Sequence, residues 1–148
     1  MEIAPSIGPH NGKGLDLMVS ESMTLQAFYR AYIDCLNRQD WDELGQYVAE
    51  DAKHNGRPFG LSGYRSMLIK DFEDIPDLCF VIDRLACDPP LIAARLLSNC
   101  SPKGQFLGLK INGRRICFAE NVFYEVKDGK IADVFSVIDK TAIEDQIA

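Results

Sequence analysis

Two side chains in the sequence have chemistry suited to moving a proton. Glu120 lies in the apolar run 115–126, where an ionised carboxylate is costly to bury unless it has a partner. His54 is the only histidine besides His10, and its ordinary pKa of about 6.5 suits general acid–base chemistry. Glu120 is therefore either a base in a pocket or an exposed carboxylate at a strand end, and His54 is a second catalytic candidate.

The residues around Glu120 in a strand would share its surroundings. Side chains alternate along a β-strand, so Val122 and Tyr124 lie on the same face as Glu120. On the next apolar run, Val134 and Ser136 occupy the corresponding face. We expect these side chains to line one pocket, unless a bulge moves the later ones to the opposite face.

A third charged side chain lies inside an apolar run. Arg95 interrupts the segment 91–100, and a charge at such a position needs a partner or a route to solvent. Glu120 is a candidate partner across the strands. The pair could bind an acidic ligand, or it could be a structural ion pair.

Three helices are expected before the strands that carry these residues. The first spans about 23–38, with Ser22 as N-cap and an apolar stripe at helical spacing. The second follows Asp40 as N-cap, and the third follows Ser62 and ends before Pro76.

The second half of the chain is predicted to form β-strands. Turn-forming residues separate its apolar runs, which predict strands at 78–87, 91–100, 115–126 and 130–139. Helices followed by an antiparallel meander predict an α+β fold, with the helices packed on one face of a curved sheet around a cone-shaped pocket. The glycine-containing loop segment "GQFLGLKINGRR", residues 104–115, is expected to cover the mouth of that pocket.

Composition limits the domain organisation and the partners. Residues 1–22 are rich in Gly, Pro, Ser and Asn and predict a flexible arm, followed by a single domain at 23–148. A net charge of −6 argues against a nucleic-acid partner. No apolar run reaches the roughly 18 residues of a membrane helix, and no export signal is visible.

The cysteines and histidines point to a cytoplasmic protein without a metal. Five cysteines, an odd number without a CxxC motif, predict reduced thiols that act as small apolar side chains. Two histidines, one of them in the N-terminal arm, do not suggest a histidine-based metal site.

Several short motifs, in their order and spacing, resemble a known family. They are "NRQDWDEL", "AEDAKHNG", "GYRSML", "IPDLCF", "IAARLL", "GQFLGLKINGRRI" and "DGKIADVFSVID". The chain is similar to the SnoaL-like branch of the nuclear transport factor 2 (NTF2-like) superfamily, which includes polyketide cyclases and ester cyclases. The resemblance implies a cone-shaped fold, a homodimer formed by the convex sheet faces, and a pocket for a small hydrophobic ligand that works without metal or organic cofactor.

The resemblance also implies positions for the pocket residues. The acid/base aspartate of the family falls at Ser136, and its partner on the preceding strand falls at Val122. Neither side chain is a base near neutral pH, so Glu120 becomes the leading acid. Asn55 matches a polar position at the pocket mouth, where it would bind a carbonyl or water; the alternative is a loop asparagine that satisfies its own turn.

Three functions stay open at this point. The first is a cofactor-independent cyclase, isomerase or hydrolase in which Glu120 or His54 replaces the absent aspartate, with Ser136 as a further catalytic candidate. The second is a non-catalytic small-molecule binding protein, because Ser136 and Val122 stand where cyclases carry acid/base groups. The third is a protein-binding module of the same fold. In the first two functions the ligand would contact five further residues: Asn55, Arg95, Tyr124, Val122 and Val134.

Overall fold

The computed structural model describes residues 12–148. Its helices are α1 (Gly12–Asn37), the 3-10 helix η1 (Trp41–Gln46), α2 (Gly60–Asp74) and α3 (Lys140–Ile147). Its strands are β1 (Val48–His54), β2 (Val81–Asp88), β3 (Leu91–Cys100), β4 (Gln105–Phe106), β5 (Leu109–Lys110), β6 (Ile116–Lys127) and β7 (Lys130–Ile138). No helix in this described part of the chain is both long and apolar enough to span a bilayer.

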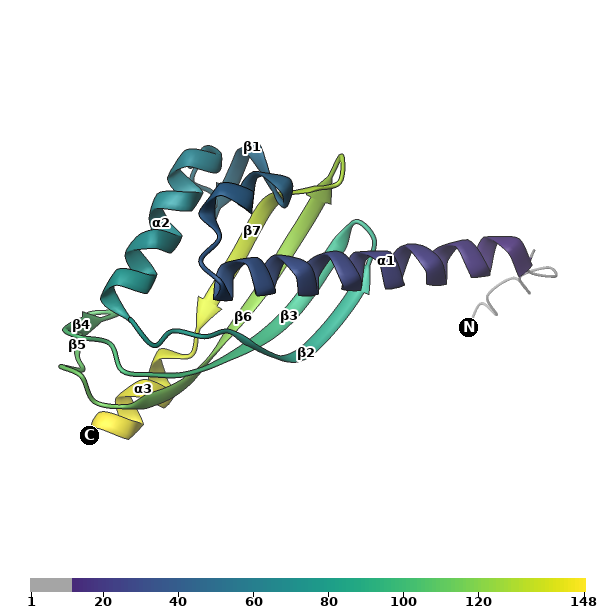
Figure 1. Ribbon diagram of the computed structural model, residues 1–148. Helices are drawn as coiled ribbons and strands as arrows, with labels where there is room; N and C mark the ends of the chain where they lie inside the picture. Colours follow the sequence, from purple (N-terminus) through teal and green to yellow (C-terminus); the bar gives the residue numbers. More distant parts are fainter. Residues whose placement is uncertain (1–11) are drawn as a thin grey trace, which may run out of the picture.

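One curved sheet carries most of the structure. Its strand order is β1-β7-β6-β3-β2, with β1 parallel to β7 and all other neighbours antiparallel. Helices α1 and α2 lie across one face of this sheet, as Figure 1 shows. The α+β fold is therefore confirmed. The sheet is mixed rather than purely antiparallel, because β1, which follows η1, joins it as a parallel edge strand.

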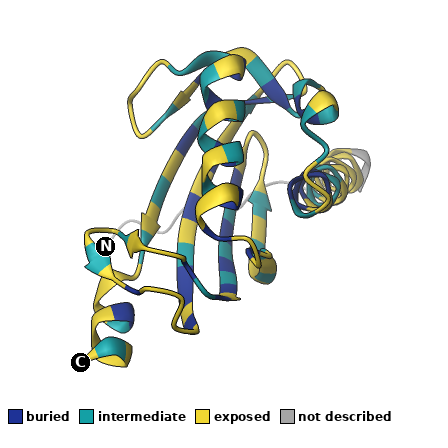
Figure 2. Ribbon diagram, turned by 60° about the vertical axis from the view of Figure 1, so that its left-hand side comes forward, coloured by how far each residue is buried: buried dark blue, intermediate teal, exposed yellow. Residues whose placement is uncertain are grey.

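The main core lies between the two helices and the sheet. Tyr29 and Tyr32 of α1 pack with Tyr64 and Leu68 of α2 against apolar side chains of β3, β6 and β7. Figure 2 shows buried and exposed residues alternating along the strands, which is the pattern of a sheet covered on one face. A second cluster gathers the end of α2, the hairpin β4–β5 and α3 around Ile111 and Phe118.

The helix boundaries differ from the sequence-based expectation at three places. Residues 12–22 continue α1 and extend it beyond the sheet (Figure 1), so this part of the predicted arm is helical; residues 1–11 of the arm lie outside the described residues. Asp40 precedes a 3-10 helix and makes no capping hydrogen bond with its side chain. Helix α2 begins two residues before Ser62, at Gly60.

The pairing of β6 with β7 sets which side chains face the helices. Val122 is opposite Ser136, Tyr124 is opposite Val134 and Glu120 is opposite Ile138. A bulge does occur, but it lies at the start of β7, where the register shifts beside Glu125. The alternation is regular from Val134 onward, so the face assignment made from the sequence holds for the pocket residues.

Candidate functional site

A cavity of about 170 Å³ lies between the helices and the sheet. Helix α1 contributes Tyr32, α2 contributes Tyr64 and Asp71, and β6 contributes Glu120. The other lining residues are apolar except for His54, Tyr124 and Ser136. The sequence-predicted residues that line this cavity are His54, Glu120, Val122, Tyr124, Val134 and Ser136.

Glu120 is the acidic group of β6 that faces the cavity. Its carboxylate makes no hydrogen bond or ion pair with any described residue, and the residue is only partly exposed. Burial, and to a lesser extent the nearby Asp71 carboxylate, raise the pKa of Glu120 to about 7. A carboxyl group that is half ionised near neutral pH can both take up and return a proton. Its position in the cavity wall is not that of an exposed strand end.

Asp71 is a second carboxyl group of the cavity, and sequence analysis missed it. Burial, followed by repulsion from Asp74, raises the pKa of Asp71 to about 6, against the opposing effect of Lys70. The signal that could have found it is helical periodicity. Tyr64, Leu68 and Asp71 follow one another at i, i+4 and i+7, the spacing of one helix face.

Three tyrosines line the cavity, Tyr32, Tyr64 and Tyr124, and the hydroxyl of each is paired with that of another tyrosine. The hydroxyls of Tyr32 and Tyr64 are 2.6 Å apart, and those of Tyr29 and Tyr124 are 3.0 Å apart. Burial raises the pKa of Tyr32, Tyr64 and Tyr124, so all three are protonated. In each pair one hydroxyl donates to the other, which leaves the second proton free to be donated to a ligand.

His54 lines the cavity from the end of β1. Its ring stacks on Phe59 at a centroid distance of 6.0 Å and meets the ring of Tyr64 edge-on. Burial, and secondarily the positive charge of Arg57, lower the pKa of His54. The imidazole is therefore neutral at pH 7, when it has one donor and one acceptor nitrogen.

Ser136 lines the cavity, whereas Asn55 does not. The Asn55 side chain is exposed and spans two backbone groups of β7: its Oδ1 accepts from the Ser136 N–H at 2.9 Å, and its Nδ2 donates to the Ser136 carbonyl at 3.3 Å. Asn55 has a φ of 50°, and its amide extends the pairing of β1 with β7 past the end of β1. The expected role of Asn55 at the ligand is thus replaced by a structural one.

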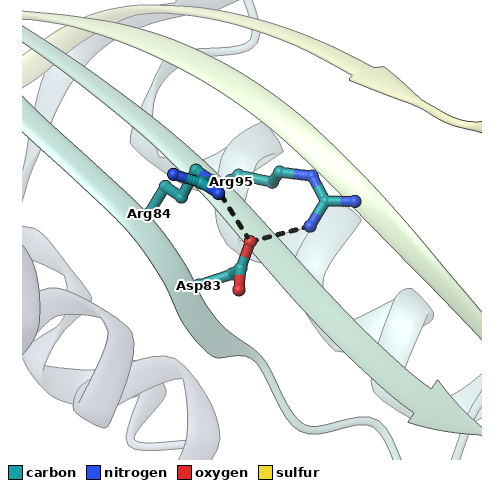
Figure 3. A network of polar contacts seen from close by, with 3 residues as sticks. All are labelled: Asp83, Arg84 and Arg95. Carbon is teal, nitrogen blue, oxygen red and sulfur yellow. Dashed lines mark hydrogen bonds and ion pairs between the residues drawn. The ribbon is translucent and has the colours of Figure 1, made fainter.

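Arg95 lies on the opposite face of the sheet from the cavity. In the pairing of β3 with β6, Arg95 is opposite Asn121, whereas the next residue, Leu96, is opposite Glu120. Its guanidinium contacts the Asp83 carboxylate at 2.7 Å, next to Arg84, as Figure 3 shows. The suggested pair with Glu120 is wrong, because the two residues point to different faces, and Arg95 is no ligand contact in this cavity.

The side chains that do meet in the cavity form a coherent chemical set. Two carboxyl groups with raised pKa values face protonated phenols and a neutral imidazole across an apolar floor that includes Val122 and Val134. No lysine or arginine lines this cavity. Such a set can exchange protons with a neutral ligand and can donate hydrogen bonds to its oxygen atoms.

Three solved structures are similar to this chain along most of their length. A SnoaL-like polyketide cyclase from Agrobacterium tumefaciens is 54% identical, with a TM-score of 0.83, over 84% of this chain and 98% of its own. TsrD from Streptomyces laurentii is 20% identical, with a TM-score of 0.73, over 85% of this chain and 96% of its own. IdmH from Streptomyces antibioticus is 18% identical, with a TM-score of 0.71, over 82% of this chain and 96% of its own. The last two share the fold alone.

No protein with a curated description matches the chain. The model of one family, described as SnoaL-like polyketide cyclase, matches residues 26–147. This match covers every residue that lines the cavity, and it agrees with the 54% identity above. The chain therefore belongs to the SnoaL-like polyketide cyclase family.

Proposed function

We propose that this protein catalyses cofactor-independent proton transfer at carbon in a small hydrophobic carbonyl compound, as a cyclase or isomerase does. The observation that carries the proposal is the Glu120 carboxylate, which faces the cavity without a partner and titrates near neutral pH. A base of this kind is most effective when its pKa is close to the working pH. The family membership supports the same class of reaction.

The reaction would begin with Glu120 as the base. Its carboxylate removes a proton from the carbon next to a carbonyl group, and the electrons of the broken C–H bond move to the carbonyl oxygen. The hydroxyl of the Tyr32–Tyr64 pair that is not used within the pair is a suitable hydrogen-bond donor to the resulting enolate oxygen. In a cyclisation the enolate carbon attacks a second carbonyl carbon of the ligand, the π electrons of that C=O bond move to its oxygen, and Glu120 returns its proton to this oxygen. In an isomerisation Glu120 returns the proton to a different carbon of the enolate.

The size of the cavity narrows the ligand class. Its volume of about 170 Å³ is close to the roughly 150 Å³ of an engineered apolar cavity that holds benzene. A molecule with one ring, or an acyclic chain of similar volume, fits this space, whereas a compound with several fused rings exceeds it. The proposed ligand is therefore a monocyclic or short-chain carbonyl compound with an apolar body.

The proposal is tested by hydrogen exchange at carbon. Monocyclic ketones are incubated with the protein in D₂O, and loss of their C–H signals is followed by NMR. Glu120→Gln should slow the protein-dependent exchange by at least about 100-fold. Glu125→Gln, an exposed residue on the other face of the same strand, is the matched control and should leave the rate unchanged. Equal rates for wild type and Glu120→Gln would refute Glu120 as the base.

A non-catalytic binding protein is the second candidate. The observation that favours it is the wall of the cavity at Ser136 and Val122, the two positions where the resemblance implies acid/base groups. Such a protein would bind a ligand of the same size and release it unaltered. NMR and mass spectrometry of the ligand recovered after incubation in D₂O separate the two candidates, because only a catalyst yields a changed structure or deuterium incorporation.

We also propose that the protein is a cytoplasmic homodimer. Three apolar side chains stand on the outer face of β6 and β7: Phe123, Phe135 and Val137, which are 61%, 50% and 70% exposed. Phe123 is directly opposite Phe135, so they form a continuous apolar patch of the kind that marks protein interfaces. The five free cysteines are typical of a reducing compartment.

A further inference from the structure

Asp71 and Glu120 stand at the junction of two cavities. Besides the cavity of about 170 Å³, a smaller one of about 60 Å³ lies under the hairpin β4–β5, where Phe106 and Phe118 line it. Four residues line both: Asp71, Phe80, Glu120 and Ile138. Two of the four are carboxylic acids, and the other two are apolar. Helix α2 and strand β6 thus bring their only cavity-facing acids to one place.

No cation neutralises these two acids. Lys70, the residue before Asp71, points to Asp74, with 3.0 Å between its Nζ and the Asp74 Oδ2. Neither cavity is lined by a lysine or an arginine. Asp71, like Glu120, makes no side-chain hydrogen bond or ion pair within residues 12–148. Lys70 acts on Asp71 only from outside the cavities, because its ammonium group pairs with Asp74. Within the two cavities, a proton is the only counter-charge that the lining residues leave for the pair.

We propose that Asp71 and Glu120 share one proton and act together as a two-carboxyl acid/base centre. This inference rests on the proposed function and deepens it, because it assigns the acid as well as the base. Two neighbouring carboxyl groups ionise in two steps, and the second step opposes the charge created by the first. Asp71 is the group that ionises first, and Glu120 the one that ionises second.

A shared proton would let the centre work without an outside acid. Of the two singly protonated arrangements, the one that holds the proton on Glu120 is the more populated, and the reactive one is the minor form in which Glu120 is ionised and Asp71 is protonated. Glu120 takes the proton from the ligand carbon, and the electron pair of the C–H bond moves to the carbonyl oxygen. Asp71 then gives its proton to another atom of the ligand. The protein ends with the same number of protons, now on Glu120, and proton exchange between the two acids restores the starting state.

The other titratable groups near the pair do not supply this proton. Tyr32, Tyr64 and Tyr124 stay protonated because burial raises their pKa, and His54 is neutral because burial lowers its pKa. On helix α2, Asp74 and Lys70 act on Asp71 in opposite directions. The acid that influences Glu120 most directly is Asp71.

The test is an NMR titration of the Glu120 side-chain carboxyl carbon, which needs no substrate. In the wild type this carbon should titrate near pH 7. Asp71→Asn should lower the pKa of Glu120 by roughly one pH unit, because it removes the neighbouring charge. Asp71→Leu removes the same charge with a side chain of similar size and should give the same shift, which guards against failure of one variant to fold.

Glu73→Gln is the matched control. Glu73 is an exposed acid on the same helix, and its replacement should leave the Glu120 titration unchanged. An unchanged Glu120 pKa in both Asp71 variants would overturn the shared proton. That outcome is distinct from failure of the proposed function: if Glu120→Gln still abolishes exchange at carbon, Glu120 is a base that works without Asp71.

Discussion

Glu120 illustrates how the surroundings of one side chain change its chemistry. An exposed glutamate titrates near pH 4.3, and it would be fully ionised and a weak base at neutral pH. Here, the apolar floor of the cavity and the second carboxyl group at Asp71 disfavour the ionised form. The same carboxyl group therefore keeps its proton until near neutral pH. No change of residue type is needed to make a base of suitable strength.

The raised pKa of Glu120 has a predicted consequence for stability. A carboxyl group whose pKa is higher in the folded than in the unfolded state stabilises the fold at low pH, and this contribution is lost as pH rises through the folded value. With a folded pKa of about 7, ionisation of Glu120 should cost the fold about 2 kcal/mol between pH 5 and pH 7.5. Glu120→Gln removes that cost.

Urea unfolding at the two pH values measures this effect. The difference in unfolding free energy between Glu120→Gln and wild type should shift in favour of the variant by about 2 kcal/mol from pH 5 to pH 7.5. Glu125→Gln, whose carboxyl group is exposed, should show a difference that is constant with pH. A constant difference for Glu120→Gln as well would mean that Glu120 titrates in the ordinary range.

At the scale of the elements, local pattern predicts most of what positions the site. The four long strands and their turns follow from apolar runs and turn residues, and strand alternation alone puts Glu120, Val122 and Tyr124 on one face. This works because each signal depends only on neighbours in sequence. The bulge in β7 does not disturb it, because the register shift precedes Val134.

Contacts between distant segments account for what the sequence did not predict. Asp71 belongs to the site only because α2 lies over β6, and nothing in the sequence of α2 states which strand it covers. Arg95 forms its ion pair with Asp83, which lies where the pairing of β2 with β3 is irregular. A single sequence does not reveal such an irregularity. The parallel pairing of β1 likewise depends on the path of the chain around α2 and the sheet.

Asn55 provides a test of how β1 is fixed to the sheet. Its side chain makes two hydrogen bonds to the Ser136 backbone, and its φ of 50° is unfavourable for most residues. Asn55→Ala should lower the free energy of unfolding by about 2 kcal/mol, through lost hydrogen bonds and added backbone strain. Denaturant unfolding measures the change.

The variant Asn112→Ala separates the effect of backbone strain from the effect of the lost hydrogen bonds. The φ of Asn112 is 54°, close to that of Asn55, but its side chain makes no hydrogen bond within the described residues. Asn112→Ala should therefore show the backbone cost alone, about 1 kcal/mol. If both variants lose the same stability, the hydrogen bonds from Asn55 to β7 contribute nothing, and Asn55 is retained only for its backbone conformation.

At the scale of the whole molecule, the two faces of the sheet have different surroundings. Helices α1 and α2 cover the inner face (Figure 1), and both contribute side chains to the wall of the cavity. No described helix covers the outer face at Phe123 and Phe135, which are exposed although they stand in the middle of long strands. Exposed phenylalanines paired across two strands are costly in a monomer. This asymmetry supports the proposal that a second copy of the chain covers the outer face of the sheet.

The outer face yields a prediction about oligomeric state. Phe123→Lys places a charge at the centre of the patch, opposite Phe135, and its burial in a dimer would be unfavourable. Because Phe123 is 61% exposed, the fold of each subunit should tolerate the lysine. Light scattering after size exclusion should give a dimer mass for the wild type and a monomer mass for Phe123→Lys at micromolar concentration. Met23→Lys changes a residue of α1 that is 64% exposed, and it should remain a dimer. A wild-type monomer, or a Phe123→Lys dimer, would show that subunits do not pair through this face.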